Sequence, residues 1–180
     1  MIITIGGLPG AGSTTVVEAL AKKLKYKTVK VGELWRRIAA EEGISGDEAE
    51  KFWKEGAKDP AELKRLHNSL DKMQKDLARK EKNTIFNGKL SGFQIPWADL
   101  KIFLVAPLDV RAERTAKRED ISAERAAKGI REREEYERKE WKKIYGFDYV
   151  LDRSIYDLVI NTAHLEANQI VKIIEMAVKR

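Results

Sequence analysis

The chain has 180 residues, with 35 Lys and Arg against 29 Asp and Glu, a net charge of +6, and no cysteine. The absence of cysteine excludes a disulfide framework, a cysteine-ligated zinc site and a thiol nucleophile. No apolar run approaches the roughly 18 residues of a membrane span, and the N-terminal MIITIGG lacks the basic start of a signal peptide. We therefore expect a cytoplasmic protein of one domain, with 43% apolar residues to build its core.

The first part of the chain is predicted to form two strand-and-helix units. Ile2–Ile5 is a β-branched run that ends at Gly6, which is typical of a buried strand. After a glycine-rich loop, apolar residues recur at helical spacing as far as Lys25. A second strand is predicted at residues 28–31 and a helix at residues 34–42, each followed by a glycine.

The middle of the chain is predicted to be helical before the sheet resumes. Residues 44–82 are polar and helical in composition. Within them, Asp59 and Pro60 form a favourable helix start, with Asp as the cap and Pro in the first turn. A third strand is predicted at residues 83–88, and the clearest strand of all is the fourth, at residues 100–105.

A long charged helical tract follows the fourth strand, at roughly residues 110–143. It is interrupted at residues 120–124, where Ser122 is placed to cap its second half. A fifth strand at 156–160 and a closing helix at 164–179 complete the pattern. The alternation predicts an α/β fold, a five-stranded parallel sheet with helices on both faces, and the charged tract is predicted to be a helical lid.

The glycine-rich loop GLPGAGST, residues 7–14, follows the phosphate-binding pattern G-x-x-x-x-G-K-[ST], except that Ser13 replaces the Lys. In that pattern, glycines let backbone N–H groups point at phosphate oxygens, and the following helix adds the positive end of its dipole. The hydroxyl of the final residue, here Thr14, ligates Mg²⁺. The alternative is a tight turn that needs glycine only for its backbone. Phosphate binding is favoured, whereas Ser13 leaves phosphate transfer open.

The spacing of arginines in the charged tract selects candidates for a phosphate site. Arg114 and Arg118 share one helical face, and Arg131 shares another with Arg138. Arg133 lies about 200° around the helix from Arg131, so at most one of these two faces the same ligand. The alternative is a solvated helix whose cations face water or pair with Glu.

Asp71, Gln74 and His67 are further polar residues to consider as site residues. Asp71 and Gln74 lie one turn apart on a helix face that could meet a nucleotide base, with solvent exposure as the alternative. His67 is not expected to bind a metal, because the chain has no cysteine and its other histidine, His164, is far away in sequence.

With these features placed, the chain resembles the P-loop nucleoside monophosphate kinases, and in particular the archaeal-type cytidylate kinases, over nearly its whole length. The resemblance is carried by residues 3–15, 32–36, 87–92, 100–104, 110–114, 131–138 and 154–162. It implies one P-loop kinase-like domain at 1–180, with a monophosphate-binding helical segment at about 33–82 and a lid at about 111–143.

The resemblance also implies roles for individual residues. The phosphates of ATP are assigned to Gly7, Leu8, Pro9, Gly10, Ala11, Gly12, Ser13, Thr14 and Thr15, with Mg²⁺ at Thr14. The acceptor nucleotide is assigned to Arg36, Asp71, Gln74, Asn87, Lys89 and Gly92. The cations around the transferred group are assigned to Arg114, Arg118, Arg131, Arg138 and Lys89.

The chain departs from the family pattern at chemical positions. Besides Ser13, Asn87 stands where an acid is usual and Lys89 where an arginine is usual. The stretch Asp71–Gln74 reads DKMQ, where the family offers DRRQ to the base. Asn keeps hydrogen bonds but loses charge, and Lys keeps the charge but loses the bidentate fork. These departures predict either tuned or weakened chemistry.

The leading function is therefore Mg²⁺-dependent phosphoryl transfer from ATP to CMP or dCMP. One alternative is the same chemistry on AMP or UMP, and another is a nucleotide-binding protein with little transfer activity because of Ser13, Asn87 and Lys89. The partners are small-molecule nucleotides, with neither membrane nor nucleic acid, because no long basic run with interleaved aromatics is present. A monomer or weak homodimer is expected.

Overall fold

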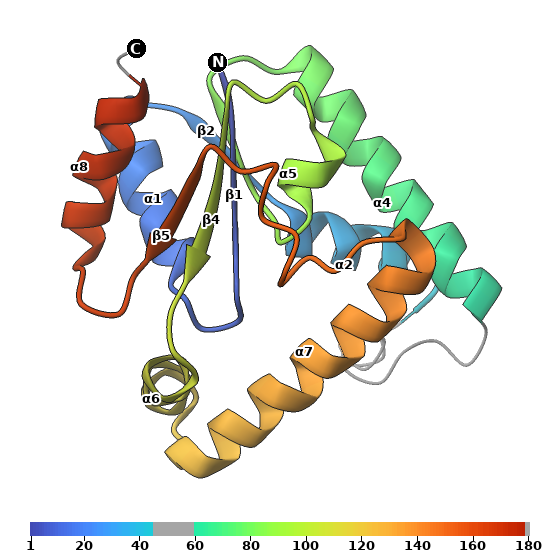
Figure 1. Cartoon of the computed structure of the whole chain (residues 1–180). Coiled ribbons are helices and arrows are strands. Elements are labelled where there is room, and N and C mark those ends of the chain that lie inside the picture. Colours follow the sequence, from blue (N-terminus) through green and yellow to red (C-terminus); the bar gives the residue numbers. More distant parts are fainter. Residues whose placement is uncertain (45–59, 179–180) are drawn as a thin grey trace.

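The computed structural model describes residues 1–44 and 60–178, and shows a five-stranded parallel sheet between two layers of helices (Figure 1). In sheet order the strands are β2 (Lys27–Lys30), β3 (Thr84–Asn87), β1 (Ile2–Gly7), β4 (Leu100–Val105) and β5 (Leu158–Asn161). The described helices are α1 (Ser13–Leu24), α2 (Val31–Glu41), α4 (Pro60–Lys80), α5 (Ser91–Gln94), α6 (Leu108–Glu119), α7 (Ala123–Tyr145) and α8 (Ala167–Val178). The predicted fold class is confirmed.

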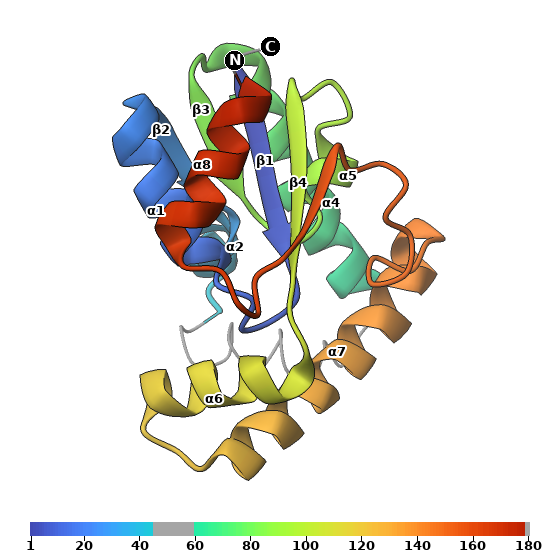
Figure 2. The same ribbon diagram turned by 60° about the vertical axis from the view of Figure 1, so that its left-hand side comes forward.

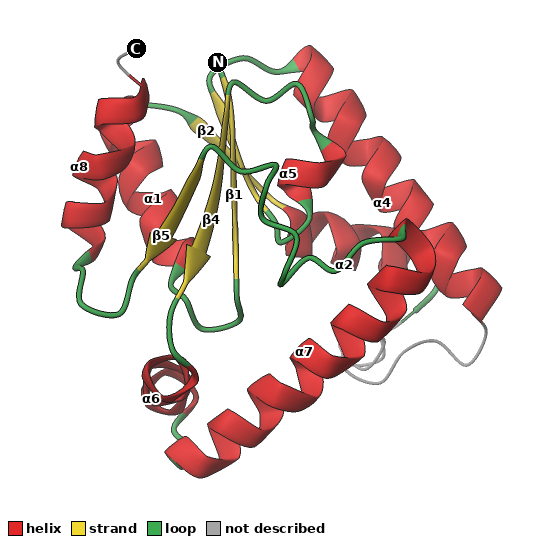
Figure 3. Cartoon of the chain, viewed as in Figure 1, coloured by secondary structure: helices red, strands yellow, loops and turns green. Residues whose placement is uncertain are grey.

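The sheet is buried because helices cover both of its faces. Helices α1 and α8 pack on one face, and α4, α5 and α2 lie on the other (Figure 3). The central strands β1 and β4 are accordingly apolar, with Ile3, Ile5 and Ile102 fully buried. In the ladder, Ile3 lies opposite Ile85 of β3 and Leu100 of β4. All five strands run parallel, so their carboxyl ends open onto one edge, where ligands bind in such folds.

The helix boundaries differ from the predicted ones where the backbone finds other partners. Val31, predicted to end the second strand, begins α2, and the four-residue helix α5 was not predicted. The predicted helix start at Asp59 lies outside the described residues, and α4 begins at Pro60. Ser122 caps α7 as predicted, since its hydroxyl accepts a hydrogen bond from the Arg125 N–H at 3.2 Å.

The fifth strand begins later than the predicted residue 156. The Tyr156 N–H donates to the Arg153 carbonyl, in a turn, and the Asp157 side chain accepts from the Lys101 N–H. The ladder with β4 therefore starts only at the pair Ile102 and Leu158.

The segment predicted to be a lid is a helical pair, α6 and α7, that lies beyond the carboxyl ends of the strands (Figure 2). The N-terminal half of α7 packs on α6 through a small separate cluster that includes Ala112, Ala126 and Ile130. Its C-terminal half joins the main core through Trp141. Among the described residues, apolar packing thus attaches only the C-terminal half of α7 to the sheet domain. The remaining contacts between α7 and the sheet domain are polar.

None of the described helices is both long and apolar enough to cross a membrane.

Candidate active site

A large cleft opens at the carboxyl edge of the sheet, between the glycine-rich loop, α4 and the lid. Its volume is about 1130 Å³, and it is lined from β1, the loop after β3, and helices α2, α4, α6 and α7. The volume is large enough for two small ligands at once, given that pockets for one small ligand measure roughly 300–1,000 Å³.

The glycine-rich loop forms one wall of the cleft through its backbone. Gly10 and Gly12 have positive φ values of 81° and 91°, which glycine adopts without strain. A side chain at Gly10 would place Cβ only 2.8 Å from the Arg111 carbonyl oxygen. Gly12 precedes α1 and supplies no side-chain cap, so the first N–H groups of α1 are left for a ligand.

Side chains hold this loop from behind. Arg111 is buried, and its guanidinium donates to the Ala106 carbonyl at 2.9 Å and to the Pro9 carbonyl at 3.1 Å. The Thr162 hydroxyl donates to the Ala11 carbonyl at 2.9 Å. The bonds to Pro9 and Ala11 use carbonyl groups of the loop. The Leu8 and Ala11 N–H groups are bonded within the backbone, to the Leu104 and Leu8 carbonyls, so the N–H groups left for a ligand are those around Gly10 and at the start of α1.

The wall formed by the glycine-rich loop has no cation at the position usual for lysine, since Ser13 lines the cleft there. Positive charge comes instead from the lid, where Arg118, Arg125, Lys128 and Arg133 line the same space. The buried Thr115 hydroxyl, next to Gly10, has no hydrogen-bond partner among the described residues. An unpaired buried hydroxyl that lines a cleft is a candidate ligand contact.

The opposite wall holds a cluster of charges around Glu137 of α7. Lys89 donates from Nζ to both carboxylate oxygens, at 2.5 and 2.6 Å. Arg133 donates from Nε at 2.9 Å and Tyr149 from its hydroxyl at 2.7 Å. Burial would raise the pKa of Glu137, but Lys89 and Arg133 outweigh it and hold the pKa below its ordinary value. Burial lowers the pKa of Lys89 to about 8, against the opposing effect of Glu137.

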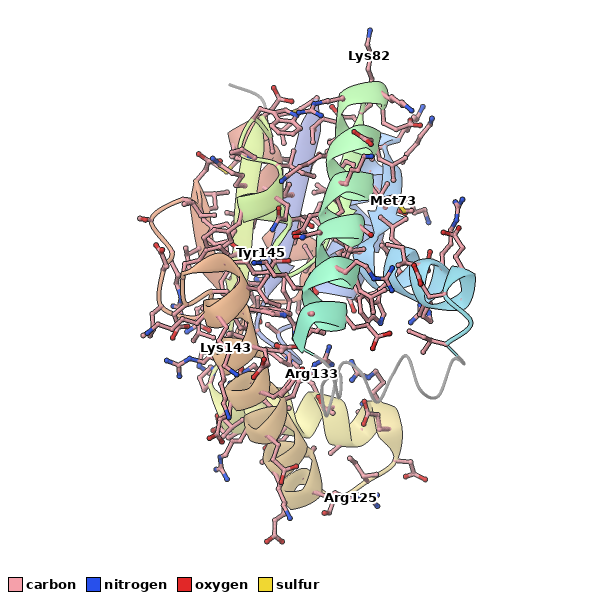
Figure 4. All side chains as sticks on the ribbon, turned by 90° about the vertical axis from the view of Figure 1, so that its right-hand side faces the viewer. Met73, Lys82, Arg125, Arg133, Lys143 and Tyr145 are labelled. Atoms are coloured by element: carbon pink, nitrogen blue, oxygen red, sulfur yellow. The ribbon has the colours of Figure 1, made fainter. Side chains whose placement is uncertain are left out.

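The inner end of the cleft is polar and aromatic, between α4 and the end of α7. The Tyr145 hydroxyl donates to Asp71 Oδ2 at 2.8 Å. Its single hydrogen is thus used, so the His67 Nδ1–H donates to the same hydroxyl at 3.1 Å. Burial raises the pKa of Asp71 to about 6 and lowers the pKa of His67 to about 4. Figure 4 shows Tyr145, Arg133 and Arg125 at successive positions along α7.

Gln74 is oriented by a neighbour at this inner end. The Ser91 hydroxyl of α5 donates to Gln74 Oε1 at 3.0 Å, which turns the amide N–H₂ group toward the remaining space. Asp71 and Gln74 therefore present an acceptor and a donor to the same end of the cleft.

The structure brings most of the predicted site residues to the cleft. Those that line it are Gly7, Leu8, Pro9, Gly10, Ser13, Thr14, Arg36, Asp71, Gln74, Asn87, Lys89 and Arg118. Arg36 and Thr14 are exposed there, and Arg36 has no partner among the described side chains.

The other predicted residues do not line the cleft, which is formed by the residues 1–44 and 60–178 that the structure describes. They are Ala11, Gly12, Thr15, Gly92, Arg114, Arg131 and Arg138. Gly92 packs against the Tyr156 ring. Arg114 donates to the Thr162 hydroxyl and carbonyl oxygens, and Arg138 forms a bidentate pair with Asp148. The roles predicted for these two arginines would require their present pairs to break.

Arg131 is exposed and points away from the cleft, whereas Arg133 lines it. The sequence spacing predicts this difference, because Arg131 and Arg133 lie about 200° apart around the helix. The residues that sequence reasoning missed are Glu137, Tyr145, His67 and Thr115. Nothing local in the sequence singles them out, because the packing of α4, α6 and α7 decides which of their side chains face the cleft.

Comparisons with known proteins show the family to which the chain belongs. A profile described as the cytidylate kinase-like family matches residues 2–164. A cytidylate kinase of Archaeoglobus fulgidus is 38% identical and one of Pyrococcus abyssi is 41% identical. Each alignment covers 99% of this chain, with 95% and 93% of the respective relative.

Solved structures with low identity share the fold. An uncharacterized protein from Eubacterium ventriosum superposes with a TM-score of 0.75 at 15% identity, over 99% of this chain and 98% of that one. A shikimate kinase from Bacteroides thetaiotaomicron gives 0.65 at 17% identity, over 100% and 99%.

Proposed function

Because the chain belongs to the cytidylate kinase-like family, we propose that it transfers the γ-phosphoryl group of ATP to CMP or dCMP. Relatives named cytidylate kinase, matched over nearly full length, make it a nucleoside monophosphate kinase. The observation that carries the choice of acceptor is the single cleft that holds a phosphate-type loop at one wall and Asp71 with Gln74 at the other.

The donor side binds ATP through backbone groups. The loop at Gly7–Thr15 offers N–H groups to the phosphates, and the start of α1 adds the positive end of its dipole. Lid cations such as Arg118 and Arg125, which line the cleft, take the place of the lysine missing at Ser13.

Magnesium fits the donor side as an ion that arrives with the nucleotide. The described residues include no group of three or more His, Cys, Asp or Glu that could hold a metal on its own. The Thr14 hydroxyl, exposed at the start of α1, is the proposed protein ligand. Bound there, Mg²⁺ neutralises phosphate charge during transfer.

The acceptor side orients the monophosphate for an in-line reaction. Arg36 and Lys89 are proposed to hold its phosphate, with Asn87 beside them as a neutral hydrogen-bonding group. An oxygen of that phosphate forms the new bond to the γ-phosphorus of ATP as the bond to the β-phosphate oxygen breaks. ADP leaves, and no covalent bond to the protein forms.

The base is proposed to be read by Asp71 and Gln74. Cytosine presents an amino donor at N4 beside an acceptor at N3, which matches a carboxylate next to an amide N–H₂. Uracil presents a carbonyl and an N–H at these places, which reverses the pattern. Adenine presents the same donor and acceptor pair as cytosine, so AMP is the second candidate acceptor on hydrogen bonding alone.

A coupled ADP-release assay with CMP, dCMP, UMP and AMP tests this function. We expect CMP and dCMP to be preferred over UMP by about 1–3 kcal/mol in transition-state binding, the usual value of one well-made pair of hydrogen bonds. Turnover that is fastest with AMP would select the second candidate. Nucleotide binding without turnover on any acceptor would instead show that the residues at Ser13, Asn87 and Lys89 have removed the transfer activity.

A further inference from the structure

We propose that Glu137 is a positioning residue, which fixes Lys89 and Arg133 as one phosphate-binding unit on the acceptor side of the cleft. Lys89 follows β3, whereas Arg133 and Glu137 belong to the lid helix α7. The inference rests on the proposed function, because the phosphate in question is that of the acceptor nucleotide.

Every acceptor site of the Glu137 carboxylate is in use. Oε1 accepts from Lys89 and Arg133, and Oε2 accepts from Lys89 and Tyr149. A carboxylate has about four lone-pair sites, so these four bonds saturate it. Glu137 is fully buried, with an exposed fraction of 0%, and therefore has no free site for a ligand or for catalysis.

By contrast, only some of the N–H donors of Lys89 and Arg133 form hydrogen bonds. Two of the three Nζ hydrogens of Lys89 point to Glu137, and the third has no hydrogen-bond partner among the described residues. Arg133 uses Nε alone, and its two terminal nitrogens have no described partner. Both side chains line the cleft. The unit thus offers several free N–H donors from positions that Glu137 fixes.

Charge arithmetic gives the same conclusion. Lys89 and Arg133 carry two positive charges and Glu137 one negative charge, so the unit keeps a net charge of +1. The neighbouring Glu134 is already paired with Arg111 at 2.7 Å. Without Glu137, the largely buried Lys89 would face the half-exposed Arg133 with no anion between them, and the flexible lysine would have no defined direction.

This arrangement also accounts for a lysine at position 89, where the family resemblance predicts an arginine. An arginine reaches a phosphate with a rigid fork of its own, whereas a lysine ends in a point charge on a flexible stem. The bidentate carboxylate restricts that stem from the other side. Glu137 thereby supplies the directionality that Lys89 lacks, and it couples the loop after β3 to the position of the lid helix.

The test compares Glu137→Gln with Glu135→Gln, an exposed acid on the same helix that does not line the cleft. KM for CMP and KM for ATP are measured separately for both variants, with the melting temperature as the control for folding. We expect Glu137→Gln to raise KM for CMP by about tenfold or more and to change KM for ATP by less than about threefold. Glu135→Gln should match the wild type in both constants.

A pH profile separates positioning from a merely structural role. The charged groups that face Lys89 are Glu137, Glu134 and Arg133, and of these Glu137 raises its pKa most. Glu137→Gln should therefore move the alkaline limb of kcat/KM for CMP to lower pH. In the double variant Glu137→Gln with Lys89→Arg this limb should disappear, because a guanidinium stays charged.

Tyr149→Phe keeps the test decisive if Glu137→Gln does not fold. It removes one hydrogen bond to Oε2 and keeps the buried ring, so KM for CMP should rise about two- to fivefold. An unchanged KM for CMP in folded Glu137→Gln, or in Tyr149→Phe if only that variant folds, would overturn the inference. If the wild type makes no CDP, the proposed function fails, and CMP affinity by calorimetry replaces KM in the same comparison.

Discussion

The donor wall and the acceptor wall of the cleft are built from different material. The donor wall is a short contiguous loop that we propose binds ATP through backbone N–H groups, with side chains such as Arg111 and Thr162 bonded to its carbonyl groups. The acceptor wall has no such loop. Its groups are side chains from α4, α5, α7 and the segment after β3, which meet only in the folded chain.

This difference explains why the two walls tolerate change differently. A backbone site depends on φ and ψ, so it is sensitive to glycine positions and insensitive to nearby side chains. A side-chain site depends on which groups remain charged and where their partners hold them. We therefore expect the lysine missing at position 13, beside a backbone site, to affect ligand binding less than the lysine present at position 89, in a side-chain site.

The largest effect should come from the donor backbone at Gly10. Gly10→Ala forces a left-handed conformation, at roughly 1–2 kcal/mol, and adds a contact at 2.8 Å from the Arg111 carbonyl. We expect KM for ATP to rise roughly 100-fold in steady-state assays, while KM for CMP changes little. The matched variant is Gly12→Ala, which has the same sign of φ but open space around its Cβ, so it should show only the conformational part. Equal effects of the two substitutions would show that the close approach to Arg111 is irrelevant.

The next effect concerns the acceptor wall at Asp71. Because burial raises the pKa of Asp71 to about 6, the carboxylate that accepts from the cytosine amino group is lost as pH falls through about 6. KM for CMP should therefore rise toward low pH in the wild type. Asp71→Asn should abolish this dependence and reduce the preference for CMP over UMP by about tenfold, because an amide can turn to match either base.

Protein stability offers a second readout of the same group. The pKa of Asp71 in the fold lies above its ordinary value of 3.8, so the folded state binds more protons between about pH 4 and 6. This contribution to stability is present below that window and is lost as pH rises through it. A slope of melting temperature against pH that is identical in wild type and Asp71→Asn would contradict the assignment.

The donor wall was more predictable from the sequence than the acceptor wall. The β-branched run at residues 2–5, the glycine spacing and the Ser122 cap are local signals, and the strands, the loop and the helix start were predictable from them. Glu137 and Tyr145 were not, because both lie in a tract rich in charge that offers many acids and cations as alternatives. Their partners are up to 78 residues away, and only tertiary packing selects them.

The resemblance to kinases identified the lysine at position 89, but it could not indicate what holds that lysine. Likewise, Arg138 has the spacing of a phosphate ligand and instead forms a pair with Asp148. Helical spacing restricts which residues share a face, and it does not establish which face meets the ligand.

The smallest effect should come from Ser13. Its backbone N–H serves the donor wall regardless of the side chain, so Ser13→Ala should change KM for ATP by less than about twofold. Thr14→Ala is the contrasting variant, since it removes the proposed magnesium ligand. It should raise the Mg²⁺ concentration needed for half-maximal rate about tenfold. A tenfold loss in Ser13→Ala would mean that the hydroxyl itself binds the phosphates.

The most direct test of the division between the two walls is a crossed titration of Lys89→Met, with CMP varied at saturating ATP and ATP varied at saturating CMP. Loss of a charged contact at about 1.5–3 kcal/mol predicts a rise in KM for CMP of roughly 10- to 100-fold. KM for ATP should stay within about threefold, because the donor loop does not use this side chain. An equal rise in both constants would contradict the account, since it would show that the acceptor cation also holds the donor.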